Sequence, residues 1–349
     1  MSEFINRPLS RRGFLGGATV AAGLGLTACG GGQQKAAEAP SGKEGGGTIT
    51  AGTAYSTQNY DPSTTSSALA LGVNWQVVEG LYGLNFHDYS TFNELATADP
   101  KKVDDYTFEI TLRDGAKFSD GNEVKADDVV ESFNRSAAKG SVYVPMLSPI
   151  ASVEKKDDKT VTVKTTIANF SLLKERLSIV RVVPASSSQD EMKKQPVGSG
   201  PWQFESISDN TLDLVPNKNY NGATPAKDDK LHYDVLKDPT ARLTAQQDGT
   251  TLAMEMVPAD AVEQLKGAGC TVDAVQGFGV RFAMFNLGKA PWDNVKVRQA
   301  CLYALDTDKM LANAFSGQAE VATSYLPSSF SNYHKASTVY AHDVDKAKK

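Results

Sequence analysis

The chain has 349 residues, of which 40% are hydrophobic and 22% are charged, and its formal net charge at pH 7 is −5. This composition is ordinary for a globular protein, and the length is sufficient for two lobes with cores of their own. A net negative charge gives no electrostatic basis for binding nucleic acid or anionic lipid, and we expect neither as a partner.

The first 28 residues have the composition of an export signal. Arg11 and Arg12 supply a positive start, a short Gly- and Ala-rich apolar stretch follows, and small residues precede Cys29. The arginine pair resembles a twin-arginine signal, and Leu-Thr-Ala-Cys resembles a bacterial lipobox, whose cysteine is acylated. We therefore predict a signal peptide over residues 1–28, and a lipid anchor on Cys29 that holds the exported protein at the outer face of the cell membrane (the periplasmic side in a Gram-negative cell).

Residues 29–47 are predicted to form a flexible tether. From Gly30 to Gly47 the chain contains only Gly, Gln, Ala, Lys, Glu, Ser and Pro. Such a segment cannot bury enough apolar surface to fold. It would leave the rest of the protein free to move close to the membrane.

Strand and helix patterns alternate over the next part of the chain. Apolar residues at every second position predict strands over residues 48–54 and 106–112, and helical spacing predicts helices over 68–81, with Gly83 as the stop, and over 126–137. Two further strands, 150–156 and 160–166, are joined by the turn Asp157-Asp158-Lys159. We interpret the part from 106 onward as a small α+β unit inserted into the chain.

A second alternation follows between residues 196 and 267. The loop Pro196–Phe204, with two glycines and two prolines, leads into a strand that continues over 211–215. Short helices are predicted over 240–248 and 260–267, with a buried strand, Leu252–Val257, between them. This alternation favours an α/β lobe with a mixed sheet.

The last third of the chain begins with a predicted strand over 280–287, in which Phe282 and Met284 alternate with their neighbours. Helices are predicted over 295–305 and 309–315, and a further helical pattern starts at 343. Cys301 falls on the apolar face of the first of these helices, where a buried free thiol is common; pairing with Cys270 remains the alternative.

Three segments together resemble the family 5 extracellular solute-binding proteins of ABC importers, the group that includes oligopeptide and dipeptide receptors. The first is 106–135, with Phe-Glu-Ile-Thr-Leu-Arg-Asp-Gly-Ala-Lys-Phe-Ser-Asp-Gly; the second is Pro196–Phe204; the third is 285–306. Lys125 stands where the family usually has Thr, which removes a helix N-cap. Family members also run further, so the resemblance implies that this chain stops within its second lobe.

The resemblance implies an α/β, periplasmic-binding-protein-like fold of the type II, cluster C-like kind, with mixed sheets in two lobes. On this basis residues 48–72 and 185–279 would form the first lobe, 73–184 an inserted α+β subdomain, and 280–349 the start of an incomplete second lobe.

The same resemblance implies a function in transport. The two lobes would close over a solute, an oligopeptide above all, and deliver it to an ABC permease and its ATPase. Relatives on this scaffold also bind nickel, haem, glycosides or opines. A truncated receptor fragment that does not transport, or a surface adhesin, is the other alternative.

Five residues in loops at strand ends of the matching segments are candidates for contacting the solute: Tyr55, Ser66, Ser67, Trp202 and Phe278. The alternative is that the aromatic residues Tyr55 and Trp202 pack in the core and that the serines form turns or helix caps.

Catalysis is not expected. The four histidines lack metal-ligand spacing, and the sequence contains neither a Gly-x-Ser-x-Gly nucleophile elbow nor a phosphate-binding Gly-x-x-x-x-Gly-Lys-Ser/Thr loop. We therefore predict a binding protein without cofactor or metal, not an enzyme.

Overall fold

The computed structural model describes residues 46–86, 88–315, 318–330 and 332–349, which all belong to one compact unit. The predicted export signal with Arg11 and Arg12, the acylation site Cys29 and all of the predicted tether before Gly46 lie outside the described residues. Within the described ranges, no helix is long and apolar enough to cross a membrane.

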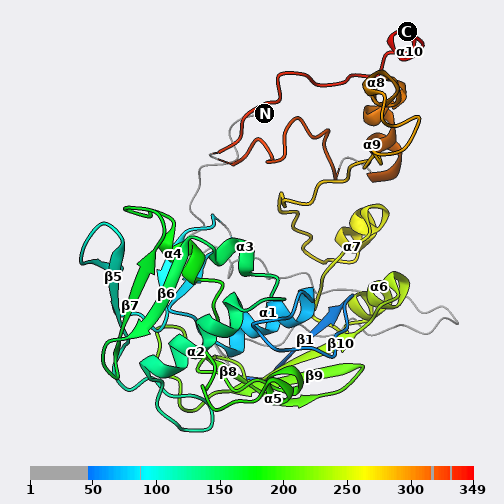
Figure 1. The fold of residues 1–349 in the computed structure, drawn as a ribbon. Helices are drawn as coiled ribbons and strands as arrows, with labels where there is room; N and C mark the ends of the chain where they lie inside the picture. Colours follow the sequence, from blue (N-terminus) through cyan, green and yellow to red (C-terminus); the bar gives the residue numbers. More distant parts are fainter. Residues whose placement is uncertain (1–45, 87, 316–317, 331) are drawn as a thin grey trace, which may run out of the picture. The chain divides into compact units, whose positions relative to one another are not determined.

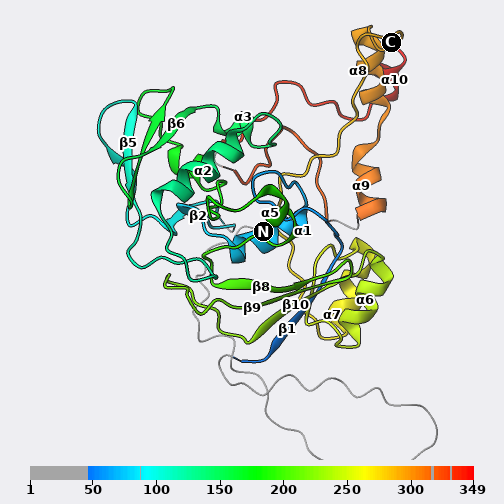
Figure 2. The same cartoon turned by 60° about the horizontal axis from the view of Figure 1, so that its bottom comes forward.

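A mixed five-stranded sheet with the order β11-β1-β10-β9-β8 supports the first of two cores (Figures 1 and 2). Strand β1 lies between β11 and β10 and pairs in parallel with both, whereas β9 runs antiparallel to both β10 and β8. The strands are β1 (Thr48–Thr53), β8 (Trp202–Ile207), β9 (Thr211–Pro216), β10 (Lys230–Val235) and β11 (Ala253–Met254).

The two faces of this sheet are covered by different helices. On one face, Ile49, Leu231 and Leu214 lie in register and pack with the buried side of α1 (Ala68–Val77). On the other face, α6 (Pro239–Gln247) packs at Gly52, where an added Cβ would lie 3.5 Å from the Leu236 side chain. The chain therefore leaves β1 and β10 toward opposite faces of the sheet.

The second core belongs to residues 81–182 and is built on a four-stranded antiparallel sheet with the order β4-β5-β7-β6. Helix α2 packs on β6 and β7, and a two-stranded sheet, β2-β3, adjoins this core. The elements are β2 (Tyr82–Leu84), β3 (Thr91–Asn93), β4 (Lys101–Lys102), β5 (Thr107–Thr111), α2 (Ala126–Ala137), α3 (Val144–Leu147), β6 (Ile150–Lys155), β7 (Thr160–Thr165) and α4 (Leu173–Leu177).

The two cores divide between Val78 and Leu81, and again between Val182 and Val183. The buried apolar residues of α1, including Val73 and Val77, pack with the five-stranded sheet, whereas the partly buried Leu71 packs against the second core. The division of the chain into lobes remains a prediction, although the residues that we assigned to an inserted subdomain from 73 onward first enter the second core at Leu81.

The remaining helices are short. They are α5 (Gln189–Lys194), the 3₁₀ helix η1 (Ala259–Ala261), α7 (Val262–Gly267), α8 (Val295–Ala304), α9 (Thr307–Phe315) and α10 (Val344–Ala347). In α8, α9 and α10 no described residue is buried, so Cys301 is only partly buried, in contrast to the prediction. Both Cys270 and Cys301 are free thiols.

Several predicted elements are confirmed. Helix α2 spans the predicted residues 126–137, and Lys125 at its N-cap lacks a capping side chain but donates its backbone N–H to the Asp128 carboxylate at 2.8 Å. The β6–β7 hairpin and the helices after residues 238, 294 and 306 are also present.

Two predicted strands are wrong. In place of a buried strand over 252–257, β11 has only two residues; Leu252 and Met256 are 52% and 59% exposed, and Met256 has a positive φ of 55°. Residues 280–287 form no strand, because no described strand pairs with their backbone; Phe282 and Met284 are 71% and 83% exposed. Alternation in sequence is insufficient where a pairing partner is lacking.

Two boundaries also differ from the prediction. Helix α1 ends at Val77 instead of residue 81, because the Val77 carbonyl accepts a hydrogen bond of 2.8 Å from the Gly200 N–H. Gly83 lies within β2 and does not stop a helix. In place of one strand that follows the loop 196–204 and continues over 211–215, the chain forms a hairpin of β8 and β9, and β8 already begins at Trp202.

Two buried ion pairs lie where the cores meet. Arg113 binds Glu79 through two parallel hydrogen bonds of 2.8 Å, and Arg181 binds Glu94 at 2.8 Å. The Arg181 guanidinium also lies 3.2 Å from the centre of the Trp75 ring. Burial raises the pKa of Glu79, and Arg113 opposes this rise. The end of α1 is thereby fastened to the second core.

Candidate functional site

The carboxyl ends of β11, β1 and β10 form the candidate site. In open α/β sheets, ligands bind outside the carboxyl ends of the strands where neighbouring connections leave toward opposite faces of the sheet. The connections after β1 and β10 do so, because α1 and α6 lie on opposite faces. The candidate site therefore consists of the residues that follow these three strands.

A carboxylate is held at this edge by the end of β1. The Glu255 carboxylate accepts hydrogen bonds from the Thr53 hydroxyl and, at 3.2 Å, from the Ala54 N–H, and both bonds go to Oε1. The Tyr55 N–H donates in turn to the Thr53 hydroxyl at 3.2 Å. Thr53 is buried, whereas Glu255 is exposed, so the carboxylate is held on its protein side by hydrogen bonds and remains open to solvent.

A buried guanidinium holds the neighbouring strand ends. Arg242, on α6, is 4% exposed and donates to the carbonyls of Leu236 at 2.6 Å, Lys237 at 3.0 Å and Met256 at 3.3 Å. These carbonyls belong to the segments that follow β10 and β11. Because a buried charge needs hydrogen-bond partners, these bonds of Arg242 stabilise this arrangement of the two segments.

On the opposite side of the sheet, Tyr233 on β10 accepts a hydrogen bond of 2.9 Å from the Gln76 side chain of α1. Burial raises the pKa of Tyr233, and the nearby Glu255 carboxylate adds to the rise. The phenol is therefore neutral at ordinary pH and available as a donor.

The structure places the five predicted contact residues in different surroundings. Tyr55 is partly buried against the first core and adjoins the Thr53–Glu255 pair. Ser66 is exposed, and Ser67 occupies the N-cap of α1 without a side-chain capping bond. Tyr55, Ser66 and Ser67 thus belong to the same connection from β1 to α1.

The two other candidates lie apart from that connection. Trp202 is 8% exposed and packs within the first core. Phe278 is 46% exposed, and its ring lies 5.2 Å from the Tyr89 ring and 4.0 Å from the Phe330 ring, between centroids. A role in solute binding remains a prediction for all five residues.

Sequence reasoning missed Glu255 and Arg242. Glu255 was hidden inside a segment predicted as a buried strand, although a carboxylate between two methionines was a possible signal. Arg242 gave no signal, because its carbonyl partners come from two separate connections.

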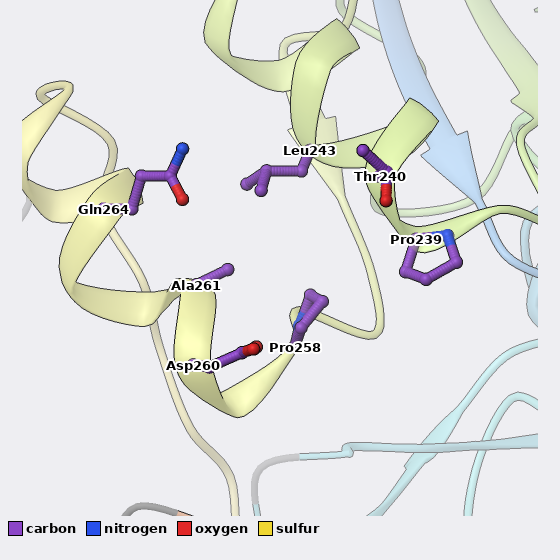
Figure 3. Close-up of a pocket in the computed structure, with 7 residues that line it drawn as sticks. All are labelled: Pro239, Thr240, Leu243, Pro258, Asp260, Ala261 and Gln264. Atoms are coloured by element: carbon purple, nitrogen blue, oxygen red, sulfur yellow. The ribbon is translucent and has the colours of Figure 1, made fainter.

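Two surface pockets are present among the described residues. One, of about 240 Å³, lies between α6 and α7, with Leu243 and Ala261 facing each other and Asp260 and Gln264 on one rim (Figure 3). Another, of about 300 Å³, is lined by Asp120 of the Phe-Ser-Asp-Gly segment and by Met192. The described residues contain no group of three or more His, Cys, Asp or Glu side chains that could hold a metal ion.

Comparison with known proteins identifies the family. The family described as bacterial extracellular solute-binding proteins, family 5, matches residues 92–349. The chain belongs to this family. The resemblance inferred from the three sequence segments is therefore confirmed, and the family is one of solute-binding proteins, not of enzymes.

Similar curated proteins bind different solutes according to their names. Heme-binding protein A of Haemophilus influenzae is 32% identical over 76% of this chain and 54% of its own length. The glutathione-binding protein GsiB of Pectobacterium atrosepticum is 28% identical over 78% of this chain and 54% of its own length. The chain spans about half the length of the curated relatives it matches.

Solved structures confirm the predicted fold class, α/β and periplasmic-binding-protein-like with mixed sheets. The periplasmic binding protein DppA of Helicobacter pylori, in complex with the peptide STSA, superposes with a TM-score of 0.75 at 20% identity, over 87% of this chain and 65% of that one. The oligopeptide-binding protein AppA of Bacillus subtilis, in complex with a nonapeptide, gives a TM-score of 0.72 at 22% identity, over 87% of this chain and 63% of that one.

Proposed function

We propose that this chain is the solute-binding component of an ABC importer and captures a small solute outside the cytoplasm. The observation that carries the proposal is the family match over residues 92–349. The site geometry supports it, since the carboxyl ends of three parallel strands hold one carboxylate that is open to solvent. The permease and ATPase of such an importer are the proposed partners.

Peptides are the proposed class of solute. Two structures that share the fold hold peptides, and a relative at 28% identity is named for glutathione, itself a tripeptide. Peptides are recognised largely through their backbone, and one receptor can therefore accept different side chains.

Haem is a second candidate, because the relative at 32% identity is named a heme-binding protein. Nickel complexes and opines are bound by proteins of similar fold, at identities that support only the fold itself.

We also propose that the solute lies between two lobes, residues 48–72 with 185–279 and a second lobe from 280 onward, and that binding favours a closed arrangement. A lipid anchor on Cys29 would keep the receptor near its permease. Incorporation of labelled palmitate into the wild-type protein, and its loss in Cys29→Ser, tests the anchor.

Thermal unfolding of the full chain with a panel of solutes tests the function. Trialanine, glutathione and haemin are the probes, and a solute at one hundred times its Kd should stabilise the native state by about 2.7 kcal/mol. A rise in Tm with trialanine or glutathione supports peptide binding, and a rise with haemin alone favours the second candidate. No rise with any of the three would contradict the proposed function.

A further inference from the structure

We propose that Glu255 binds a cationic side chain of the solute, so that the site prefers basic peptides over neutral ones. This inference rests on the proposed function and extends it by naming the property of the solute that the strand-end site selects. Three features of the Glu255 carboxylate support it: the hydrogen bonds that fix it, the apolar residues near it and the absence of a positive partner among the described residues.

The Glu255 carboxylate is preorganised. Two donors from the end of β1, the Thr53 hydroxyl and the Ala54 N–H, hold one carboxylate oxygen, Oε1. No described residue donates a hydrogen bond to the other oxygen, Oε2. A fixed carboxylate with one oxygen available can accept a charge-assisted hydrogen bond without first losing side-chain freedom.

The negative charge of Glu255 has no positive partner among the described residues. Three of the partly or fully buried carboxylates do have positive partners: Glu79 pairs with Arg113, Glu94 with Arg181, and Asp213 with both Lys230 and His232. The buried Arg242 donates its hydrogen bonds to backbone carbonyls. The charge at the strand ends is therefore left for a group from outside.

The neighbours of Glu255 along the strand ends suit a long basic side chain. Met256 follows Glu255 in the chain, is 59% exposed and offers apolar surface; Tyr55, whose N–H donates to the same Thr53 hydroxyl that binds Glu255, is partly buried. Lys and Arg side chains combine an apolar stem with a charged head, and they favour sites that offer both. The net charge of −5 also raises the local concentration of cationic solutes.

A purely structural role for Glu255 is the competing explanation, in which the carboxylate only closes the end of β1. The isosteric change Glu255→Gln separates the two roles. A glutamine oxygen can still accept from Thr53 and Ala54, whereas the charge is removed. A loss of charge preference without a loss of stability is therefore specific to a binding role.

The experiment compares triarginine with tricitrulline, whose side chains have nearly the same shape but no charge, by calorimetric titration of the full chain. For the wild type we expect triarginine to bind about tenfold more tightly. For Glu255→Gln this preference should disappear, while tricitrulline binds as it does to the wild type. Glu263→Gln removes another exposed carboxylate, which lies on α7 and pairs with Lys266, and should keep the preference, which controls for overall charge.

Four results of the titrations would contradict the proposed role of Glu255. Equal affinities of the wild type for the two peptides, or a preference that survives in Glu255→Gln, would overturn the role of Glu255 and leave peptide binding intact. A preference lost equally in Glu263→Gln would overturn it in favour of a general charge effect. Failure of the wild type to bind either peptide would refute peptide binding and this inference together.

Discussion

The ion pair between Arg113 and Glu79 provides the sharpest test of how the two cores are joined. The side chain of Glu79 is 5% exposed and that of Arg113 is 16% exposed, and two bonds of 2.8 Å connect them. Arg113→Met removes the positive partner and leaves a buried carboxylate. Breaking a buried pair in this way costs about 3–5 kcal/mol of unfolding free energy.

The measurement is urea unfolding of wild type, Arg113→Met, Glu79→Gln and the double variant. We expect the double variant to lose less stability than the two single variants together, because no uncompensated charge remains. The control Lys164→Met breaks an exposed pair with Glu154, whose side chains are 50% and 53% exposed, and should cost about 0–1 kcal/mol.

The pH dependence gives a second check on the same pair. Burial raises the pKa of Glu79, and Arg113 opposes the rise, so Arg113→Met should raise this pKa further. At neutral pH the variant carries a buried charge, and protonation of Glu79 at lower pH removes the penalty. The stability deficit of Arg113→Met should therefore shrink as the pH falls. A deficit no larger than that of Lys164→Met, or one independent of pH, would refute the reasoning.

Three further predictions concern single positions. Gly198→Ala should destabilise the protein strongly, because the new Cβ would lie 2.0 Å from the Val77 carbonyl oxygen, whereas Gly267→Ala has open space and should be tolerated in the same urea assay. Trp202→Ala should cost about 3–5 kcal/mol, since Trp202 is 8% exposed in the first core; a smaller loss, with weakened solute binding, would favour a cleft role. His232 lies between Asp213 and Asp234, which raise its pKa against the opposing effect of burial. Wild type should therefore exceed His232→Gln in stability below the unfolded-state pKa of about 6.5, and the advantage should fade as the pH rises through the higher folded-state value; a constant difference across pH would contradict this sign.

Local sequence patterns predicted the elements whose partners are close in the chain. Helix α2 has Val129 and Phe133 at helical spacing, and both are buried. The β6–β7 hairpin is formed by adjacent strands around the turn at Asp157 and Asp158. In both cases the information that sets the element lies within a few residues of it.

Elements that depend on distant partners were not predictable in this way. Residues 252–257 alternate like a strand, yet only two residues pair with β1, which lies about two hundred residues earlier in the chain. For the same reason Glu255 was missed: its anchors, Thr53 and Ala54, are identified only once β1 and β11 are known to be neighbours. A carboxylate gives no sequence signal of which donors will hold it.

Helix α1 connects the strand-end site with the joint between the cores. Its Gln76 side chain donates a hydrogen bond to Tyr233 on β10, and the carbonyl of its last residue, Val77, accepts one from the Gly200 N–H. Two residues further along the chain, Glu79 forms its ion pair with Arg113. The Glu255 carboxylate, however, is held by β1 and not by α1. Damage to the joint by Arg113→Met should therefore lower stability without changing the preference for triarginine in the molecules that remain folded, whereas Glu255→Gln should do the reverse. These opposite effects of the two variants are expected only if the preference for triarginine arises at the strand ends.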